Sequence, residues 1–493
     1  MVGAPNILIV MVDQLNGTIF PDGPAEFLHA PALRRLAGRS ARFANTYCAS
    51  PLCAPSRASF MSGMLPSRTG VYDNAAEFAS AIPTFAHHLR RAGYRAILAG
   101  KMHFVGPDQL HGFEERLTTD IYPADFGWTP DWSRPHERID WWYHNLGSVQ
   151  SAGTAEITNQ IEFDEEVAFL ARQRLHQLAR RADDRPFCLT VSFTHPHDPY
   201  VARPEFWDLY PPGRIPPLAV PAIAYEAQDP HARRLLDMSD WRRFALTDQQ
   251  ITDSRRGYCA NISFLDSLIE GLLDTLERCG FGDDTVVVFT SDHGDMLGER
   301  GLWFKMSYLE GAARVPLLIA APGLAAGLRS APASTLDVLP TLLDLAGIVA
   351  PSDERDGTSL LGTRGGFVAG EYAAEGAIAP MIMLRDARYK FIASPVDPPL
   401  FFDLDADPHE QRNLALHPAL PGFAAEAARR WNLASFDADV RRSQARRHAV
   451  YPALRNGNYY PWDFQPLQQA AERYTRNHMD VDAVDRRARY PLG

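Results

Sequence analysis

Short apolar runs recur along the chain and alternate with longer stretches of helical periodicity. The runs are rich in Val, Ile, Leu and Phe without a regular polar alternation, as is typical of strands buried on both faces of a parallel sheet. They span residues 6–12, 95–100, 187–193, 285–292 and 315–321. This βα rhythm predicts an α/β fold with a large, mostly parallel sheet flanked by helices on both faces.

Two amphipathic stretches are among the expected covering helices. Residues 165–182 and 261–280 carry apolar side chains at helical spacing. Gly280 closes the second stretch and is a typical helix stop. After about Gly370 the pattern changes to short strands and turns that are followed by a helix.

This change of pattern predicts the domain organisation. We expect a catalytic α/β domain over residues 1–370 and a smaller C-terminal α+β subdomain over residues 371–445. Residues 446–493 are rich in Tyr, Pro, Asn and Arg, with little helical period at first. We expect an extended C-terminal tail there that contacts a neighbouring subunit of a homo-oligomer.

Composition and charge narrow the class of protein. The chain has 493 residues, is 46% hydrophobic and carries a formal net charge of -11, which argues for a folded protein and against a nucleic-acid partner. The first apolar run is too short to span a membrane and lacks the features of a signal peptide. The five cysteines are scattered and odd in number, which favours a reducing compartment. We therefore expect a cytoplasmic protein with no membrane partner.

Polar side chains follow the predicted strands directly. They are Asp13 and Gln14, Lys101 and His103, His195 and His197, and Asp292 and His293. Ligands of open α/β sheets bind beyond the carboxyl ends of the strands. We therefore expect these groups to meet at one edge of the sheet although the sequence separates them widely.

The stretch CAPSRASFMSG, residues 53–63, begins at a predicted helix N-terminus, where an anion is favoured by free N–H groups and the helix dipole. A phosphatase-type thiolate loop needs Cys and Arg separated by five residues, and position 59 is Ser. A buried structural cysteine is the simple alternative for Cys53. A third alternative is conversion of Cys53 to formylglycine, an aldehyde carried as its gem-diol.

The third alternative rests on a family resemblance. The segment resembles the signature of the sulfatase family, within the alkaline phosphatase-like superfamily, at Cys53, Pro55, Ser56 and Arg57, with Ser62-Gly63 where Thr-Gly is commoner. The resemblance implies formylglycine at Cys53, made by a formylglycine-generating or equivalent maturation enzyme. It also implies one bound divalent metal and attack of a gem-diol oxygen on the sulfur of a sulfate ester.

The expected site residues combine this resemblance with donor chemistry. A hard cation prefers oxygen ligands, and the expected metal ligands are Asp13, Gln14, Cys53, Asp292 and His293. The expected catalytic residues are Cys53, Arg57, Lys101, His103, His197 and Lys305, with His197 or Lys305 protonating the leaving oxygen and His103 deprotonating the second hydroxyl. Gln14 and His293 depart from the common family pattern toward its phosphonate-hydrolase and choline-sulfatase branches. The metal therefore stays open among Ca²⁺, which we expect first, Mn²⁺ and Mg²⁺.

Longer tracts resemble the choline sulfatase branch, including residues 100–131, 193–210 and 292–306. This implies hydrolysis of choline-O-sulfate to choline and sulfate, and a tetramer. Aromatic faces and negative charge hold a quaternary ammonium, and Trp128, Trp132, Trp141, Trp142 and Tyr143 lie in one insert. The expected substrate-binding residues are Trp128, Asn74, Asn145 and Glu375. The alternatives are a phosphonate monoester or phosphodiester hydrolase, another alkyl or aryl sulfatase, and a non-catalytic protein, either a choline-sulfate binder or an inactive relative that serves as an assembly subunit.

Overall fold

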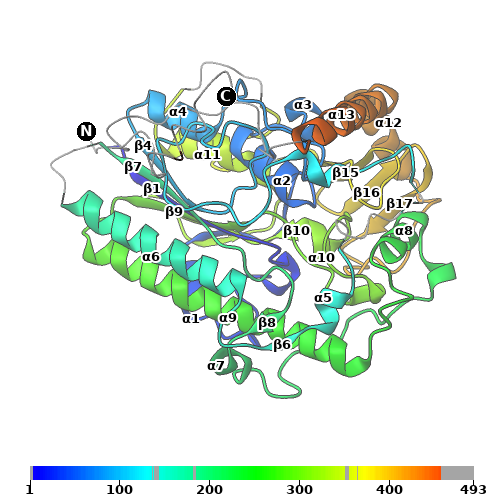
Figure 1. Cartoon of the computed structure of the whole chain (residues 1–493), viewed down its shortest axis with the longest axis horizontal. Coiled ribbons are helices and arrows are strands. Elements are labelled where there is room, and N and C mark those ends of the chain that lie inside the picture. Colours follow the sequence, from blue (N-terminus) through cyan, green and yellow to red (C-terminus); the bar gives the residue numbers. More distant parts are fainter. Residues whose placement is uncertain are drawn as a thin grey trace.

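An eight-stranded sheet forms the centre of the molecule (Figure 1). The computed structural model describes residues 4–135, 137, 144–180, 185–349, 355–362, 365–456 and 483. Across the sheet the strands are β12 (Gly327–Arg329), β2 (Ala41–Phe43), β11 (Leu317–Ala320), β9 (Thr285–Ser291), β1 (Asn6–Val12), β7 (Phe187–Ser192), β4 (Arg95–Gly100) and β5 (Glu115–Arg116).

The pairing confirms a mostly parallel sheet. β1 lies between β7 and β9 and pairs with both in parallel, and β4 pairs in parallel with β7 and β5. The strand expected over 315–321 differs, because β11 begins at Leu317 and runs antiparallel to β9 and β2. Pro316 has no N–H to donate, and Val315 before it belongs to β10 (Arg314–Val315), which pairs with β3 (Thr46–Tyr47).

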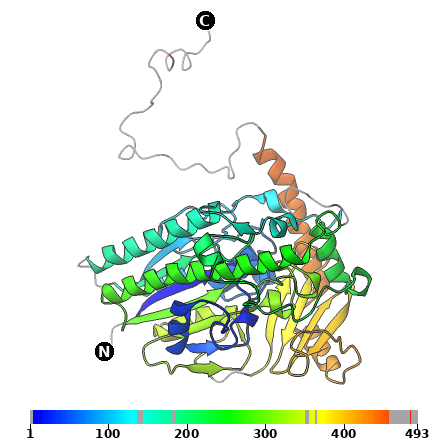
Figure 2. The same ribbon diagram turned by 90° about the horizontal axis from the view of Figure 1, so that it is seen from below.

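Helices cover both faces of this sheet, as the sequence predicts (Figures 1 and 2). Alternate side chains of β1 point to opposite faces, so Leu8 and Val10 pack with one set of helices and Ile7 and Ile9 with the other. The first set is α1 (Pro31–Gly38), α6 (Asn159–Ala179) and α9 (Asp248–Arg278). The second set is α2 (Cys53–Ser62), α4 (Phe85–Arg91) and α11 (Val338–Leu345).

The two longest covering helices start earlier than their apolar periodicity indicates. The side chain of Thr158 accepts a hydrogen bond from the Ile161 N–H at the start of α6. Thr247 and Gln250 form a reciprocal capping box at the start of α9. Polar first turns of this kind carry little apolar signal, which explains the difference.

The C-terminal part forms a second, antiparallel sheet of β14 (Val368–Tyr372), β15 (Met381–Arg385), β16 (Tyr389–Ser394) and β17 (Asp397–Asp403). The helices α12 (Leu420–Arg430) and α13 (Leu433–Leu454) follow it. The tail expected to be extended from residue 446 is therefore helical through Leu454. Residues 457–482 and 484–493 of that tail lie outside the described residues.

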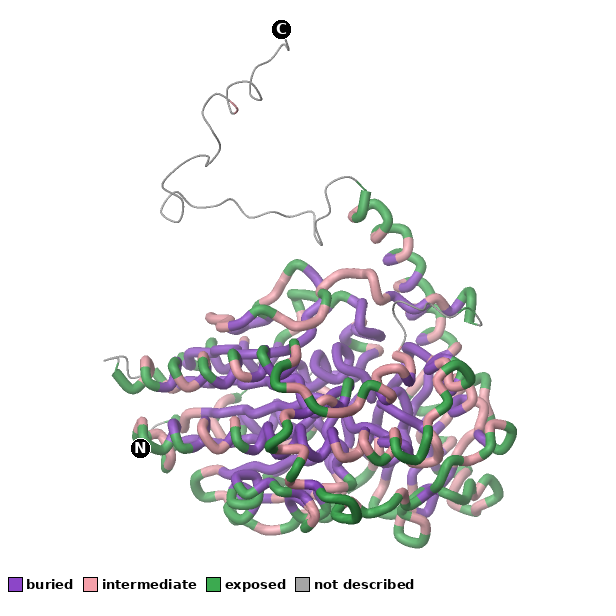
Figure 3. The backbone as a smooth tube through the Cα atoms, turned by 60° about the horizontal axis from the view of Figure 1, so that its bottom comes forward, coloured by how far each residue is buried: buried purple, intermediate pink, exposed green. Residues whose placement is uncertain are grey.

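Short elements complete the fold. They are β13 (Ala333–Ser334) beside β3, the pair β6 (Gly153–Thr154) and β8 (Val201–Ala202), the helices α3 (Pro66–Thr69), α5 (Gly147–Gln150), α7 (Pro204–Trp207), α8 (Pro230–Met238) and α10 (Glu310–Ala313), and the 3-10 turns Gly17–Ile19, Phe126–Trp128, Tyr225–Ala227, Glu299–Gly301 and Thr335–Asp337. Figure 3 shows that the buried backbone gathers in the sheet and its inner helices. Among the described helices, none has the length and apolarity that crossing a bilayer would take. All five cysteines are free thiols.

Candidate active site

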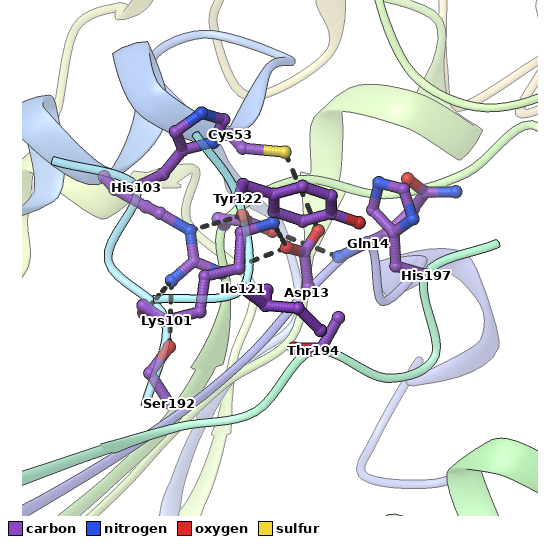
Figure 4. A network of polar contacts seen from close by, with 12 residues as sticks. Asp13, Gln14, Cys53, Lys101, His103, Ile121, Tyr122, Ser192, Thr194 and His197 are labelled. Atoms are coloured by element: carbon purple, nitrogen blue, oxygen red, sulfur yellow. Dashed lines mark hydrogen bonds and ion pairs between the residues drawn. The ribbon is translucent and has the colours of Figure 1, made fainter. Parts of the chain in front are cut away.

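Buried polar side chains meet at the carboxyl edge of the sheet, as its topology predicts (Figure 4). Asp13 follows β1, Lys101 follows β4 and Asp292 follows β9, and each is at most 1% exposed. Cys53 is the first residue of α2 and points toward the same place. Groups from four separate elements therefore share one enclosed site.

Four of these side chains form a compact donor cluster. The ligand atoms of Asp13, Cys53, Asp292 and His293 all lie within 4.8 Å of one another. Cys53 Sγ lies 3.2 Å from His293 Nε2 and 3.9 Å from Asp13 Oδ1. His293 Nδ1 faces the carbonyl oxygen of Gly294 at 3.1 Å, which assigns the proton to Nδ1 and leaves the Nε2 lone pair directed into the cluster.

This donor set fits a divalent metal. Two buried carboxylates and an imidazole nitrogen with a free lone pair suit a cation that accepts oxygen and nitrogen ligands. Burial lowers the pKa of His293, which keeps its ring neutral and able to bind a metal. Four of the five predicted ligands thus come together, and they would hold the ion next to position 53.

Arg57 organises the carboxylates of the cluster. Its Nε donates to Asp292 Oδ2 at 2.8 Å and its Nη2 to Asp13 Oδ2 at 3.3 Å. Nη1 donates to the Lys101 carbonyl oxygen at 2.6 Å and to Ser192 Oγ at 2.8 Å. Because the guanidinium is fully buried and its donors are used within the protein, it fixes both carboxylates rather than reaching outward.

Lys101 adds a second positive charge beside Asp13. Its ammonium group forms an ion pair with Asp13 and lies 4.1 Å from the centre of the Tyr122 ring. Burial by itself raises the pKa of Asp13, but the positive charges of Lys101 and Arg57 outweigh burial and hold that pKa well below its usual range. Asp13 is therefore an anion at neutral pH.

Gln14, Lys305 and His197 form a second polar group next to the cluster. Lys305 Nζ donates to Gln14 Oε1 at 2.6 Å and to His197 Nε2 at 2.6 Å. Gln14 Nε2 donates to Asp295 at 2.7 Å and to Asp198 at 3.3 Å. The structure thus places the Gln14 amide against Lys305, and its predicted role as a metal ligand stays a prediction.

The proton positions in this group follow from its geometry. His197 Nδ1 lies 2.7 Å from the Asp198 carbonyl oxygen, so Nδ1 carries the proton and Nε2 accepts from Lys305. Burial, and then the Lys305 charge, lower the pKa of His197 well below its usual range. Burial opposes the charge on Lys305, but nearby negative groups raise its pKa above the usual value. Lys305 is the ammonium donor of the pair and His197 is neutral.

His103 lies in an aromatic group with Tyr122 and Trp128. Its ring stacks on Tyr122 at 5.6 Å and meets Trp128 edge-on at 5.8 Å between ring centres. Figure 4 shows the Tyr122 ring between His103 and His197. Neither ring nitrogen of His103 has a hydrogen-bond partner among the described residues, although the side chain is buried. Such a ring is available to exchange a proton with a bound molecule.

The remaining predicted residues have distinct surroundings. Asn74 Oδ1 accepts a hydrogen bond from the Ala54 N–H at 2.9 Å, so it caps α2 next to Cys53. Asn145 Oδ1 accepts from the Gly147 N–H at 2.9 Å at the start of α5. Trp141, Trp142 and Tyr143 lie outside the described residues.

Glu375 is buried beside a cavity of about 380 Å³. The lining of this cavity includes Asp131, Trp132, Glu137 and Asp237. Glu375 Oε2 meets no hydrogen-bond donor among the described residues. Burial raises the pKa of this carboxyl to about 7. A buried carboxylate oxygen without a donor is suited to a cationic group that cannot form hydrogen bonds.

Sequence reasoning did not single out Tyr122, Ser192, Asp198 or Asp295 as site residues. Tyr122 was one aromatic residue among many, and its place over Lys101 depends on how the loop after β5 returns to the sheet edge. Ser192 could have been predicted, because it is the last residue of β7 and polar residues at the carboxyl ends of the strands were expected to lie in the site.

Comparison with known proteins decides the family. The sulfatase family model matches residues 5–348, well over half of the chain. The chain belongs to the sulfatase family. A second family model, described as choline sulfatase enzyme C terminal, matches residues 438–490 of this sulfatase.

Among known relatives of this sulfatase, choline-sulfatase of Rhizobium meliloti is 61% identical and the match covers 100% of this chain and 99% of that protein. A multifunctional alkaline phosphatase superfamily protein of Trinickia caryophylli is 27% identical, with 88% of this chain and 96% of that protein covered. The solved phosphonate monoester hydrolase of Silicibacter pomeroyi matches with a TM-score of 0.68 at 24% identity, over 86% of this chain and 94% of that chain. The last likeness shows the shared fold.

Proposed function

We propose that this sulfatase hydrolyses choline-O-sulfate to choline and sulfate. The supporting observation is the full-length similarity at 61% identity to a choline-sulfatase, joined to a complete set of charged and proton-transfer groups around Cys53. A protein that only binds the ester has no need of the Lys305–His197 pair or of the unpartnered His103 ring. Hydrolysis breaks the bond between sulfur and the choline oxygen.

The sulfatase family generally uses formylglycine and a divalent metal, and we propose both for this chain at Cys53 and at the adjacent donor cluster. When present, they supply a hydrated aldehyde as the nucleophile and a Lewis acid for the sulfate oxygens. Asp13, Asp292 and His293 would hold the ion. Arg57 fixes the two carboxylates, and Lys101 adds positive charge where the sulfate oxygens become more negative.

Protons are moved by groups on either side of position 53. Lys305 carries the proton of its pair with His197, so one of these two protonates the choline oxygen as it leaves. His103 has free ring nitrogens and takes the proton whose removal releases sulfate. Separate donor and acceptor groups allow both steps at one pH.

The choline head is held by faces and charge rather than by hydrogen bonds. Trp128 packs against His103 and presents an aromatic surface beside the reactive groups. Glu375 supplies the anionic partner. The positive charge of Lys305 lowers the pKa of this carboxyl, although the larger effect of burial raises it. We also propose a cytoplasmic location, which the five free thiols support. We further propose Ca²⁺ as the bound metal, a maturation enzyme that converts Cys53 to formylglycine, and a homotetramer as the assembly.

A direct comparison of substrates tests the function. Purified protein is expected to hydrolyse choline-O-sulfate with a kcat/KM at least about 100-fold above that for 4-nitrophenyl sulfate or a phenyl phosphonate monoester, because only the first carries the ammonium group. Choline and sulfate release are measured directly. Faster turnover of the phosphonate ester would favour the rival hydrolase function, which the fold of the Silicibacter pomeroyi enzyme keeps open.

The carboxyl of Glu375 predicts a pH dependence that is specific to the choline ester. As pH falls through about 7, this carboxyl takes up a proton and loses the charge that attracts the ammonium. The ratio of kcat/KM for choline-O-sulfate to that for 4-nitrophenyl sulfate is expected to fall below pH 7 and to be constant above it, since kcat/KM reports the free enzyme. Glu375→Gln is expected to lower the ratio about tenfold and to remove its pH dependence.

Glu371 offers a matched control for this measurement. It is also a buried carboxyl whose pKa burial raises to about 7, but it binds Ser67 and Trp431. Glu371→Gln is expected to leave the pH profile of the ratio in place. An unchanged profile in Glu375→Gln would remove Glu375 from the substrate site.

A further inference from the structure

One face of the C-terminal helix α13 holds the segment that carries Trp128. Arg441 Nη1 donates to the Trp132 carbonyl oxygen at 3.1 Å, and the Trp132 N–H donates to Gln444 Oε1 at 3.0 Å. His448 Nε2 lies 3.0 Å from the Pro130 carbonyl oxygen. These helix positions are three and four residues apart, so they lie on one face of α13, and this face contacts Pro130 and Trp132.

Arg447 lies on the same face and reaches further inward. Its Nη1 donates to Asp73 Oδ1 at 2.6 Å and to Thr129 Oγ1 at 3.1 Å, and its Nη2 donates to Asp73 Oδ2 at 2.7 Å. Arg447 is 5% exposed and Asp73 is fully buried. A forked contact of this kind fixes the direction of both partners as well as their distance.

The partners of Arg447 are each one residue away from a predicted substrate-binding residue. Thr129 follows Trp128, and Asp73 precedes Asn74. Asn74 in turn caps the Ala54 N–H at the start of α2, next to Cys53. The Arg447 guanidinium therefore connects the loop that carries Trp128 to the loop that carries Asn74, next to Cys53.

We infer that Arg447 is a positioning residue. It sets the distance between Trp128, which contacts the ammonium group, and the sulfate-binding site around Cys53, and so determines specificity for the choline ester. This inference rests on the proposed function. It links the matched C-terminal region, which begins within α13, to substrate choice. A buried ion pair is weak support for stability because apolar residues of similar size often replace it without loss.

The test compares substrates in variants of full-length protein. Arg447→Ala is expected to lower the ratio of kcat/KM for choline-O-sulfate to that for 4-nitrophenyl sulfate by at least about tenfold, since small displacements of positioned groups cost this much or more. The loss is expected as a higher KM for choline-O-sulfate and a weaker Kd for choline. The inhibition constant of inorganic sulfate is expected to change less than the Kd for choline.

Two conservative variants test the same inference if Arg447→Ala folds poorly. Arg447→Lys retains the charge but loses the fork, and Asp73→Asn retains the shape but loses the charge, so each is expected to give a smaller fall of the same ratio. Arg446→Ala is the matched control, because Arg446 is the exposed neighbour on the same helix. It is expected to match the wild-type ratio.

The outcomes separate the two proposals. Wild-type protein without turnover of choline-O-sulfate would overturn the proposed function. Wild-type turnover with an unchanged substrate ratio in folded Arg447→Ala, Arg447→Lys and Asp73→Asn would overturn the inference alone. An equal loss on both substrates would do the same, since it would show a structural role without effect on specificity.

Discussion

Cys53→Ala is expected to lower kcat for choline-O-sulfate by about 10⁴-fold or more, the effect of removing a nucleophile. Cys53 is the only cysteine in the donor cluster with Asp13, Asp292 and His293 among the described residues. Cys53→Ser is expected to release at most about one equivalent of choline, because a sulfated serine has no second hydroxyl with which to expel sulfate.

The chemical state of Cys53 gives a second measurement. The peptide spanning Leu52 to Arg57 from active protein is expected to carry an aldehyde in place of the thiol, detected by its mass and by reaction with a hydrazide. Cys259→Ala is the matched control, since Cys259 is equally a buried thiol, on α9. Full turnover by Cys53→Ala, or an unmodified thiol in fully active protein, would exclude the formylglycine mechanism.

Asp13→Asn is expected to lower both bound metal and kcat, the latter by about 10³-fold, because removing one charge of a buried group leaves its partners uncompensated. The variant replaces one of two cluster carboxylates and leaves the Lys101 ammonium without its anion. Chelation of the wild type is expected to abolish turnover. Restoration by Ca²⁺, Mn²⁺ or Mg²⁺ then identifies the metal.

Asp266→Asn separates metal loss from general destabilisation. Asp266 is a buried carboxylate on α9 that accepts the Ala32 and Leu33 N–H groups at the start of α1. Its replacement is expected to lower the melting temperature while the metal content, measured by elemental mass spectrometry, stays at the wild-type level. Wild-type metal content and turnover in Asp13→Asn would contradict the assignment of the cluster.

The sequence predicted the central strands well because continuous apolar runs have few alternatives to burial. β1, β4, β7 and β9 lie where their runs indicate, and the polar residues after them meet at one edge because parallel strands end together. The direction of β11 was not predictable, since an apolar run has no mark of orientation. The placement of Cys53 beside this edge followed from its family signature.

Side-chain contacts between residues far apart in the sequence could not be predicted. The Arg447–Asp73 pair joins residues 374 positions apart, and a single sequence gives no sign of such a pairing. The hydrogen bond from the Ala54 N–H to Asn74 at the start of α2 could not be predicted for the same reason, because it depends on how the loop with Asn74 folds back onto the helix. Lys305 and His197 were predicted as alternatives for one task, and the structure shows them in direct contact.

The depth of Cys53 also bears on how active protein is obtained. Cys53 is 2% exposed and lies among buried polar side chains that follow strands of the sheet, so no protein-sized catalyst reaches its sulfur in the folded chain. Under the proposed mechanism, oxidation of this thiol has to precede folding, during or soon after synthesis on the ribosome. The active fraction of a preparation is then fixed by the host cell at that moment, and treatment of the purified, folded protein cannot raise it.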